Sequence, residues 1–325
     1  MVALRSHVNP VVKSGFTLVE LSIVLVIIGL IIGGVLVGRE LINAATVRAQ
    51  ISQIEKYQTA VNTFRGKYGY LPGDIPDPIA TQYAFAARGQ YEGEGDGNGV
   101  IEGIQFDGAN DENGTASFTG EAAVFWTDLS AANLIEGKFN TATSNTFPGS
   151  VTGAAIANYF PPAKIGNGNY VYVYSGGPGS GWPDNSNNMN YFGFSVVTSC
   201  YKCSGGSMGS GVPAAFPNIA VANAYAIDNK IDDGLPQSGR VTANYVDVMR
   251  PGNTTVAWAA GGDGSSGSTF GKESASPAYG PTTAATAGAA NTCYDNGGVN
   301  GITQHYSMEQ NNGAGINCAL SFEFQ

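Results

Sequence analysis

The chain has 325 residues, of which 46 are glycine and only 12% are charged. From Gly69 to Gln325, eight Lys and Arg stand against 22 Asp and Glu, so this part carries a net charge of −14. Such an acidic surface repels phosphate backbones and excludes nucleic-acid binding through a broad basic patch. Sparse charge among abundant Gly, Ser, Thr and Asn favours an exported, loop-rich β protein over a cytosolic enzyme.

The first long element is an apolar run at residues 16–38, whose only ionisable residue is Glu20. At about 1.5 Å per residue, these 23 residues are long enough to cross the ~30 Å hydrocarbon core of a bilayer as a helix. A cleavable secretory signal has an apolar stretch of only about 7 to 15 residues. Arg5 and Lys13 precede the run and mark the cytoplasmic side, so we expect the rest of the chain to be exported.

Glu20 is costly in this setting. A carboxylate within a bilayer helix costs roughly 2.5 to 3.5 kcal/mol and usually marks a function with a nearby partner. The run contains no cation to pair with it. If the chain is cut between Gly15 and Phe16, the new α-amino group heads the helix, and the amine of one copy can pair with Glu20 of a neighbour.

The stretch KSGFTLVELSIVLVIIGLIIG, residues 13–33, resembles the class III signal and N-terminal helix of type IV pilins and type II secretion pseudopilins. The resemblance implies cleavage after Gly15 by prepilin peptidase and N-methylation of Phe16. It also implies assembly, through the helix and Glu20, into a filament with itself or related pilins on a pilus or secretion platform. Val37 stands where many pilins have proline, which favours a pseudopilin.

The resemblance also implies where the protein resides. Before assembly it is a single-pass protein of the inner membrane with a periplasmic head. After assembly it belongs to a pilus or pseudopilus, and a pilus reaches the cell surface.

Residues 39–68 continue as an amphipathic helix, because apolar residues recur every three or four positions. The stripe consists of Val47, Ile51, Ile54, Tyr57, Val61, Phe64 and Tyr68. We expect a globular domain to pack on it; the alternative is a coiled-coil stalk. Gly69 and the prolines of YLPGDIPDP end the helix. The expected organisation is a leader at 1–15, a membrane and filament-core helix at 16–38, a helical stem at 39–68 and a head at 69–325.

The segment EGDGNGVIE, residues 94–102, has the spacing of a calcium loop. Oxygen-bearing side chains alternate with glycine, so they can turn toward one centre, as Ca²⁺ requires. The predicted ligands are the side chains of Glu94, Asp96, Asn98 and Glu102 and the carbonyl of Val100.

One feature departs from the calcium pattern. Gln105 stands at the twelfth position, where a bidentate Glu is expected, and Glu102 or Asp107 would have to substitute for it. A solvated Gly/Asp turn without metal therefore stays open as an alternative.

A second acidic group, IDNKIDDGLP, ends a helical pattern that begins near residue 219. Asp228, Asp232 and Asp233 offer oxygens for a cation, but Lys230 lies among them. We favour a helix end capped by Gly234.

Four cysteines in an exported chain predict disulfides. Of three pairings we favour nearest neighbours, Cys200 with Cys203 and Cys293 with Cys318. Half a zinc site at CYKC is the alternative, but no second Cys pair of that spacing follows.

The rest of the head alternates short apolar runs with turn residues. NYVYVYSG, NYFGFSVVTSC and CALSFEFQ predict antiparallel strands, AVFWTDLSAANLIEG predicts a short helix ended by Gly137, and residues 252–291 predict a long surface loop. The fold class is therefore α+β: a long N-terminal helix, membrane-spanning and then amphipathic, packed on a loop-rich antiparallel head, as in type IV pilins.

The favoured function is a structural subunit of a type IV pilus or a type II secretion pseudopilus, and not an enzyme. One alternative is a minor tip pilin or adhesin that binds an extracellular ligand through its head. A membrane-anchored exported hydrolase ranks last. Ser207 in GGSMG fits G-x-S-x-G but lacks the flanking strand and helix, and His305 is the only histidine left after processing.

Overall fold

The computed structural model describes residues 15, 17–89, 93–104, 112–113, 117–146, 148–176, 187–200, 203, 211, 213–250, 253–258, 282 and 292–325. Contacts divide the chain into two compact units, one reaching to Thr46 and the other running from Val47 to Gln325. We call the second unit the head and describe each unit by itself.

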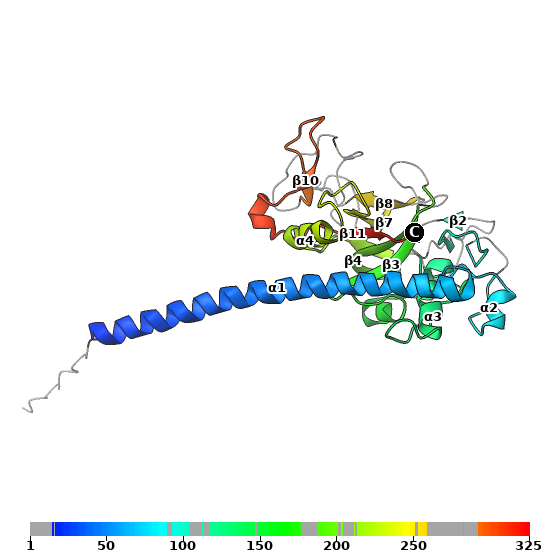
Figure 1. The fold of residues 1–325 in the computed structure, drawn as a ribbon, viewed down its shortest axis with the longest axis horizontal. Helices are drawn as coiled ribbons and strands as arrows, with labels where there is room; N and C mark the ends of the chain where they lie inside the picture. Colours follow the sequence, from blue (N-terminus) through cyan, green and yellow to red (C-terminus); the bar gives the residue numbers. More distant parts are fainter. Residues whose placement is uncertain are drawn as a thin grey trace, which may run out of the picture. The chain divides into compact units, whose positions relative to one another are not determined.

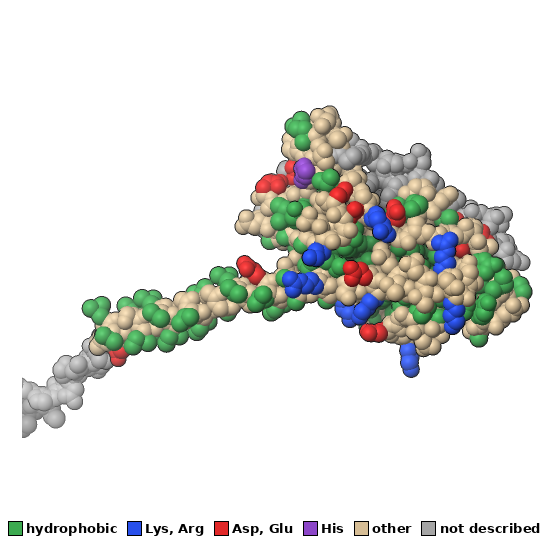
Figure 2. Space-filling view, viewed as in Figure 1, with side chains coloured by type: hydrophobic (Ala, Val, Ile, Leu, Met, Phe, Trp, Pro, Cys, Tyr) green, Lys and Arg blue, Asp and Glu red, His purple; other side chains and the backbone are tan. Residues whose placement is uncertain are grey.

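The first unit holds the beginning of helix α1, which runs from Leu18 to Tyr68. An 18-residue window of α1 has a mean hydropathy of 2.9, and none of it is buried. The apolar side chains there are exposed over 46% (Ile28) to 87% (Leu18) of their surface, and they cover the helix in Figure 2. By length and composition this helix can cross a membrane, as the sequence predicted.

In the head, α1 presents the predicted apolar stripe to a sheet. Six of its seven members are buried, namely Val47, Ile51, Ile54, Tyr57, Val61 and Phe64. The seventh, Tyr68, is partly buried and packs on the same core. The helix ends at Tyr68, and Gly69 follows with a φ of +82° that favours glycine. The packed stripe confirms the amphipathic helix and sets aside the coiled-coil alternative.

The main sheet has five antiparallel strands. Strands β3 (Asn169–Ser175), β4 (Asn190–Cys200), β11 (Leu320–Glu323) and β6 (Val241–Thr242) lie in that order, and β5 (Pro213–Phe216) pairs with β4. The three predicted strands are β3, β4 and β11. The chain's last strand lies between β4 and β6 because Phe322 pairs with both Phe192 and Val241. The α+β class of the prediction is thus confirmed (Figure 1).

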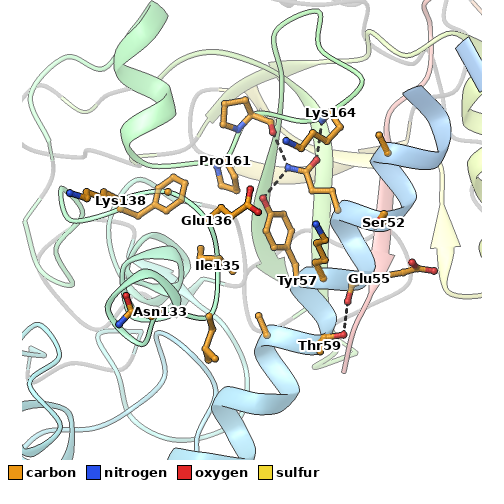
Figure 3. A pocket seen from close by; sticks show the side chains of 18 of the residues that line it. Ser52, Glu55, Tyr57, Thr59, Asn133, Ile135, Glu136, Lys138, Pro161 and Lys164 are labelled. Atoms are coloured by element: carbon orange, nitrogen blue, oxygen red, sulfur yellow. Dashed lines mark hydrogen bonds between the residues drawn. The ribbon is translucent and has the colours of Figure 1, made fainter. Parts of the chain in front are cut away.

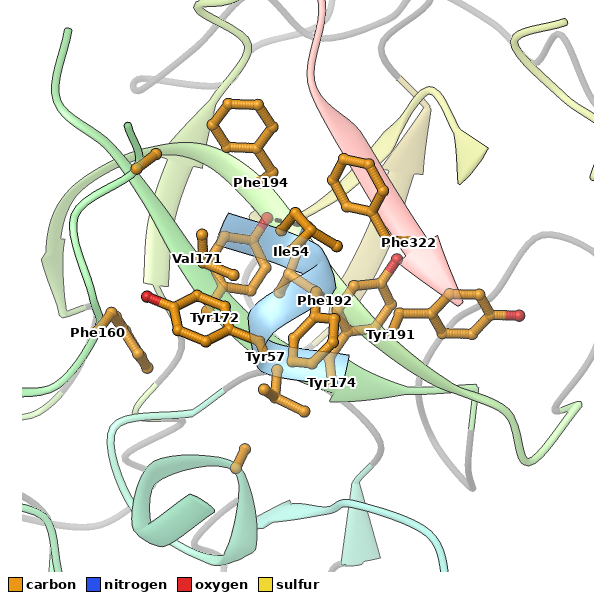
Figure 4. Close-up of a cluster of buried hydrophobic side chains, with 14 of the residues drawn as sticks. Ile54, Tyr57, Phe160, Val171, Tyr172, Tyr174, Tyr191, Phe192, Phe194 and Phe322 are labelled. Carbon is orange, nitrogen blue, oxygen red and sulfur yellow. Dashed lines mark hydrogen bonds between the residues drawn. The ribbon is translucent and has the colours of Figure 1, made fainter. Parts of the chain in front are cut away.

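Aromatic side chains fill the space between α1 and the sheet (Figure 4). The ring of Tyr57 lies 4.9 Å from that of Trp126, and Phe192 stacks on Phe324 at 4.3 Å. Trp126 and Phe192 are both fully buried. Buried rings of this size contribute most of the apolar area that stabilises such a core.

Helix α3 (Glu121–Ala131) is shorter than predicted, since the sequence suggested an end at Gly137. Asn133 instead adopts a left-handed conformation, with φ of 55°. The N–H of Leu134 donates to the carbonyl of Leu129 at 3.0 Å, and that of Asn133 to Ser130 at 3.0 Å. This Schellman pair satisfies the last carbonyls, so the helix stops there.

The remaining elements are short except for α4 (Val221–Ile231) and the ribbon of β7 (Asn244–Arg250) with β8 (Asn253–Trp258). Residues 253–258 are therefore a strand where the sequence suggested a loop; most of 259–291 lies outside the described residues. The short elements are α2 (Ile79–Gln82), β1 (Gly103–Ile104), β2 (Glu112–Asn113), η1 (Gly153–Asn158), β9 (Tyr294–Asp295), β10 (His305–Tyr306) and η2 (Gln310–Gly313).

Two disulfides brace the head. They join Cys200 to Cys203 and Cys293 to Cys318, which is the nearest-neighbour pairing. Because both pairs are bonded, their thiols offer no zinc ligands. The second bridge ties β9 to the segment that leads into β11.

Candidate functional site

The start of α1 is closed by a reciprocal hydrogen-bond pair between Thr17 and Glu20. The Glu20 Oε2 atom accepts from the Thr17 N–H at 2.8 Å and from the Thr17 hydroxyl at 2.9 Å. In return, the Glu20 N–H donates to Thr17 Oγ1 at 3.3 Å. This is a capping box, which satisfies N–H groups that have no partner in the first turn of a helix.

The capping box gives Glu20 a role within one chain that the sequence analysis missed. Its signature, Thr17 followed three residues later by Glu20 ahead of an apolar run, was present in the sequence. Gly15 is exposed, and Phe16 lies outside the described residues. An acid in the first turn also interacts favourably with the helix dipole.

A glycine-rich loop between α2 and α3 turns its backbone N–H groups toward two buried carboxylates. Glycines at 93, 95, 97 and 99 all have positive φ, between 73° and 113°. Asp74 accepts from the N–H groups of Gly97 at 2.7 Å and Gly99 at 2.9 Å. Glu121 accepts from those of Gly95 and Glu102, both at 3.0 Å.

Asp74, Asp96 and Glu121 bring carboxylate oxygens within 4.8 Å of one another. Asp74 is 1% exposed and Glu121 is fully buried. Burial, reinforced by the charge of Asp96 and opposed by the hydrogen bonds from the Gly97 and Gly99 N–H groups, raises the pKa of Asp74 to about 7. Burial, followed by the charges of Asp74 and Glu102, raises the pKa of Glu121 well above its usual range. Asp96 itself is exposed, and like charges gathered around two buried carboxylates favour protonation or a bound cation.

Of the five predicted calcium ligands, Asp96 belongs to the group of three carboxylates. Glu94 and Glu102 are buried in the same loop. The Asn98 Oδ1 atom accepts from the Val100 N–H at 2.7 Å. Gln105 and Asp107 lie outside the described residues.

Sequence reasoning missed Asp74 and Glu121. Neither lies in the loop: Asp74 follows the end of α1, and Glu121 is the first residue of α3. The signals available were an isolated acid in LPGDIP and an acid after a turn, and both are common without function. The donor set contains only oxygen, which suits a hard cation such as Ca²⁺.

A buried ion pair supports this loop. The Arg88 guanidinium lies 2.5 Å from the Asp128 carboxylate, and both side chains are fully buried. Asp128 also accepts from the Gly73 N–H at 2.7 Å, and Arg88 Nε donates to the Ile75 carbonyl at 3.1 Å. A Cβ on Gly95 would lie 2.8 Å from Arg88 Cδ, so the loop packs directly on the arginine.

Helix α4 ends at Ile231 with Asp232 as its C-cap residue, and Gly234, which the sequence analysis favoured as the cap, follows two residues later with a φ of +75°. Asp228 accepts from the Gly234 N–H at 3.2 Å and from the Tyr306 hydroxyl at 2.8 Å. Burial raises its pKa to about 7. Asp233 accepts from the Leu235 N–H at 2.8 Å. Oxygens of Asp228, Asp232 and Asp233 also lie within 4.8 Å of one another, but the loop uses them as hydrogen-bond acceptors.

A groove of about 1070 Å³ lies between α1 and the chain that follows α3 (Figure 3). One wall is the exposed face of α1, the other is residues 133–139, and Pro161, Pro162 and Lys164 lie at one end. Tyr57 forms the floor; Gln53 Nε2 donates to its hydroxyl oxygen at 2.9 Å. Burial, reinforced by the charge of Glu136, which points toward the tyrosine, and opposed by the hydrogen bond from Gln53, raises the pKa of Tyr57 to about 12.

The hydrolase alternative gains no support from the described residues. His305 is exposed on β10, and Ser207 lies outside the described part of the chain.

The comparison with protein families links the first helix to a known motif. The family model for the prokaryotic N-terminal methylation motif matches residues 12–36. This is the prepilin-type cleavage and methylation motif of type IV pilins and pseudopilins. No curated protein and no solved structure shows significant similarity to the chain.

The match defines a class of protein: an exported protein that is like a type IV pilin or pseudopilin, whose motif belongs to structural rather than catalytic proteins. The motif implies processing by prepilin peptidase and assembly into filaments with related pilins. The exposed apolar helix fits anchoring in the inner membrane before assembly.

Proposed function

We propose that this protein is a structural subunit of a type IV pilus or of a type II secretion pseudopilus. Prepilin peptidase cleaves it between Gly15 and Phe16, and Phe16 becomes the methylated amino terminus. Until assembly, the apolar helix holds the protein in the inner membrane with its head in the periplasm. The carrying observation is that the methylation motif at residues 12–36 coincides with an apolar helix whose side chains are exposed.

In this proposal the apolar face of α1 first meets lipid and later meets the helices of other subunits. The Glu20 carboxylate then pairs with the α-amino group of Phe16 in a neighbouring copy. Away from water the two charges attract each other more strongly than in an exposed pair, and this attraction offsets the cost of leaving Glu20 unpaired among apolar side chains. It would also fix the register between helices, because only one position along the apolar face carries the charge.

The capping box needs a hydrogen-bonding side chain at position 20, whereas the intermolecular pair needs a negative charge there. Substitutions of Glu20 can distinguish these two roles. Glutamine at the third helical position still completes a capping box, but it carries no charge. We expect Glu20→Gln and Glu20→Ala to be processed normally and both to lower the amount of chain in sheared filaments at least tenfold. Mass spectrometry of the N-terminal peptide would check processing, and immunoblots of sheared material would measure assembly.

Glu40→Gln is the matched control, because Glu40 is an exposed acid of α1 beyond the apolar run. It should assemble as the wild type does. Normal filaments from Glu20→Gln together with a defect in Glu20→Ala would assign the role to the capping box and contradict the pairing. A chain found uncut and outside any filament would refute the proposed function.

We also propose that the head binds Ca²⁺ through Asp74, Asp96 and Glu121, with the loop of residues 94–102 folded around the ion. Support comes from four carboxylates that are at most 4% exposed, on Asp74, Glu94, Glu102 and Glu121. Burying several acids together is unfavourable unless a cation or protons neutralise them. The bound ion would hold the loop against α3 and takes no part in chemistry.

Calorimetry of the full chain in detergent tests this site. After a chelator has removed metal, checked by elemental analysis, Ca²⁺ at 100 times its dissociation constant should add about 2.7 kcal/mol to stability. For a domain of this size that raises the melting temperature by roughly 5 to 10 °C. Glu121→Gln should abolish the rise, whereas Glu136→Gln, on the groove, should keep it. If Ca²⁺ left the melting temperature of the wild type unchanged, the proposed calcium site would be wrong.

A further inference from the structure

The groove beside α1 has an apolar lining flanked by charged side chains. Its apolar lining comes from Tyr57, Leu134, Ile135, Phe139, Pro161 and Pro162. Three exposed lysines, Lys56, Lys138 and Lys164, stand on its two walls and at its end, against Glu55 and Glu136. The groove therefore carries a small positive charge, while residues 69–325 as a whole carry −14.

The lining follows α1 from Ala49 to Thr63, which at about 1.5 Å per residue makes the groove roughly 20 Å long. A volume near 1070 Å³ leaves room for several large side chains at once. A concave apolar surface of this extent is typical of a binding site.

Elsewhere on the head, an exposed surface has the opposite character. We call it the α4–η2 knob and define it by Tyr225, Met308, Glu309 and Ile316. Tyr225 is 38% exposed, Met308 37% and Ile316 52%. Glu309, beside Met308, is exposed and adds a negative charge. Figure 1 shows η2 and β10 projecting from the head near α4.

Three contacts anchor the knob to the rest of the head, which reduces the conformational entropy that binding would cost. The ring of Tyr225 packs against Tyr306 at 6.0 Å. The N–H of Val221 donates to the Gly315 carbonyl at 2.9 Å, which fixes the chain just before Ile316. The disulfide between Cys293 and Cys318 closes the same region.

We infer that the α4–η2 knob of one copy docks in the α1 groove of the next copy. The apolar side chains of the knob meet the apolar lining, and Glu309 meets the lysines of the groove. Knob and groove share no residue, so the contact is heterologous: each docked copy still offers a free knob or a free groove, and in a filament such contacts run on from copy to copy. This inference rests on the proposed filament function and names the contact between neighbouring heads.

Cysteine cross-linking in assembled filaments of the full chain tests the contact. Ser52 is exposed and lines the groove, and Met308 is an exposed apolar side chain of the knob. Filaments of the Ser52→Cys, Met308→Cys double variant, treated with a short bismaleimide, should give a ladder of covalent multimers. Each single variant should give none. The matched control is Asn62→Cys with Met308→Cys, because Asn62 is exposed on α1 but does not line the groove.

The outcomes separate this inference from the function on which it rests. Filaments that form but yield no ladder, or an equal ladder from the control pair, overturn the docking and leave the filament subunit intact. Cross-linking of Met308→Cys alone indicates a symmetric contact and also overturns it. So does a Ser52→Cys adduct with a different polypeptide. A chain that never enters filaments overturns both the docking and the proposed function.

Discussion

Replacing Arg88 with methionine tests the buried ion pair beneath the glycine-rich loop. Methionine keeps most of the apolar stem and removes the charge, which leaves the Asp128 carboxylate fully buried with the Gly73 N–H as its remaining described donor. Breaking a buried pair in this way typically costs about 3 to 5 kcal/mol. For a domain of this size, each kcal/mol lowers the melting temperature by roughly 2 to 4 °C.

The double variant Arg88→Met, Asp128→Asn shows whether the charge is the cause. Asparagine keeps an oxygen for the Gly73 N–H but buries no charge, so the double variant should be more stable than Arg88→Met alone. Urea unfolding of the full chain in detergent, followed by tryptophan fluorescence, measures both, since Trp126 lies in α3 with Asp128. A loss below about 0.5 kcal/mol for Arg88→Met, or additive losses in the double variant, would refute the reasoning.

Two further predictions follow from the acidic groups. The pKa of Asp228 is raised to about 7, so the folded state keeps a proton that the unfolded state releases between about pH 4 and 7. Stability from this group therefore falls as the pH rises through that range, and Asp228→Asn should melt at a higher temperature than the wild type at pH 8 and at a similar one at pH 4. A pH-independent difference would contradict this. Glu121→Gln removes one buried acid, so without metal it should be at least as stable as the wild type at pH 8, as thermal melts would show. A marked loss would mean that its hydrogen bonds to Gly95 and Glu102 outweigh its charge.

The first helix, α1, could be predicted from local sequence patterns alone. The sequence has an apolar run with one acid near its start, followed by an apolar stripe that repeats every three or four residues. Both patterns are typical of a helix, so together they predict one long helix, α1. The end at Tyr68 follows from Gly69 and the prolines after it. The strands β3, β4 and β11 were predictable for the same reason, since apolar and aromatic runs bounded by turn residues are signals that extend over only a few positions.

The candidate cation site could be predicted only in part from local sequence patterns. The loop's glycines and Asp96 are contiguous in sequence, but Asp74 and Glu121 reach it only because the end of α1 and the start of α3 converge there. The order of strands, with β11 between β4 and β6, is likewise set by packing between distant segments. Repeating patterns of side chains can be recognised in a sequence. Contacts between residues tens of positions apart depend on how the helices and strands pack together.

By itself, the sequence determined that this protein has an export-directed apolar helix with the methylation motif, an amphipathic continuation and an acidic β-rich head. The tertiary structure alone decided which carboxylates share a buried place and that the head bears a groove beside α1 and the α4–η2 knob. The physical reason is one of range: helix periodicity, caps and turns act between near neighbours, while burial and charge act between whatever residues the fold brings together.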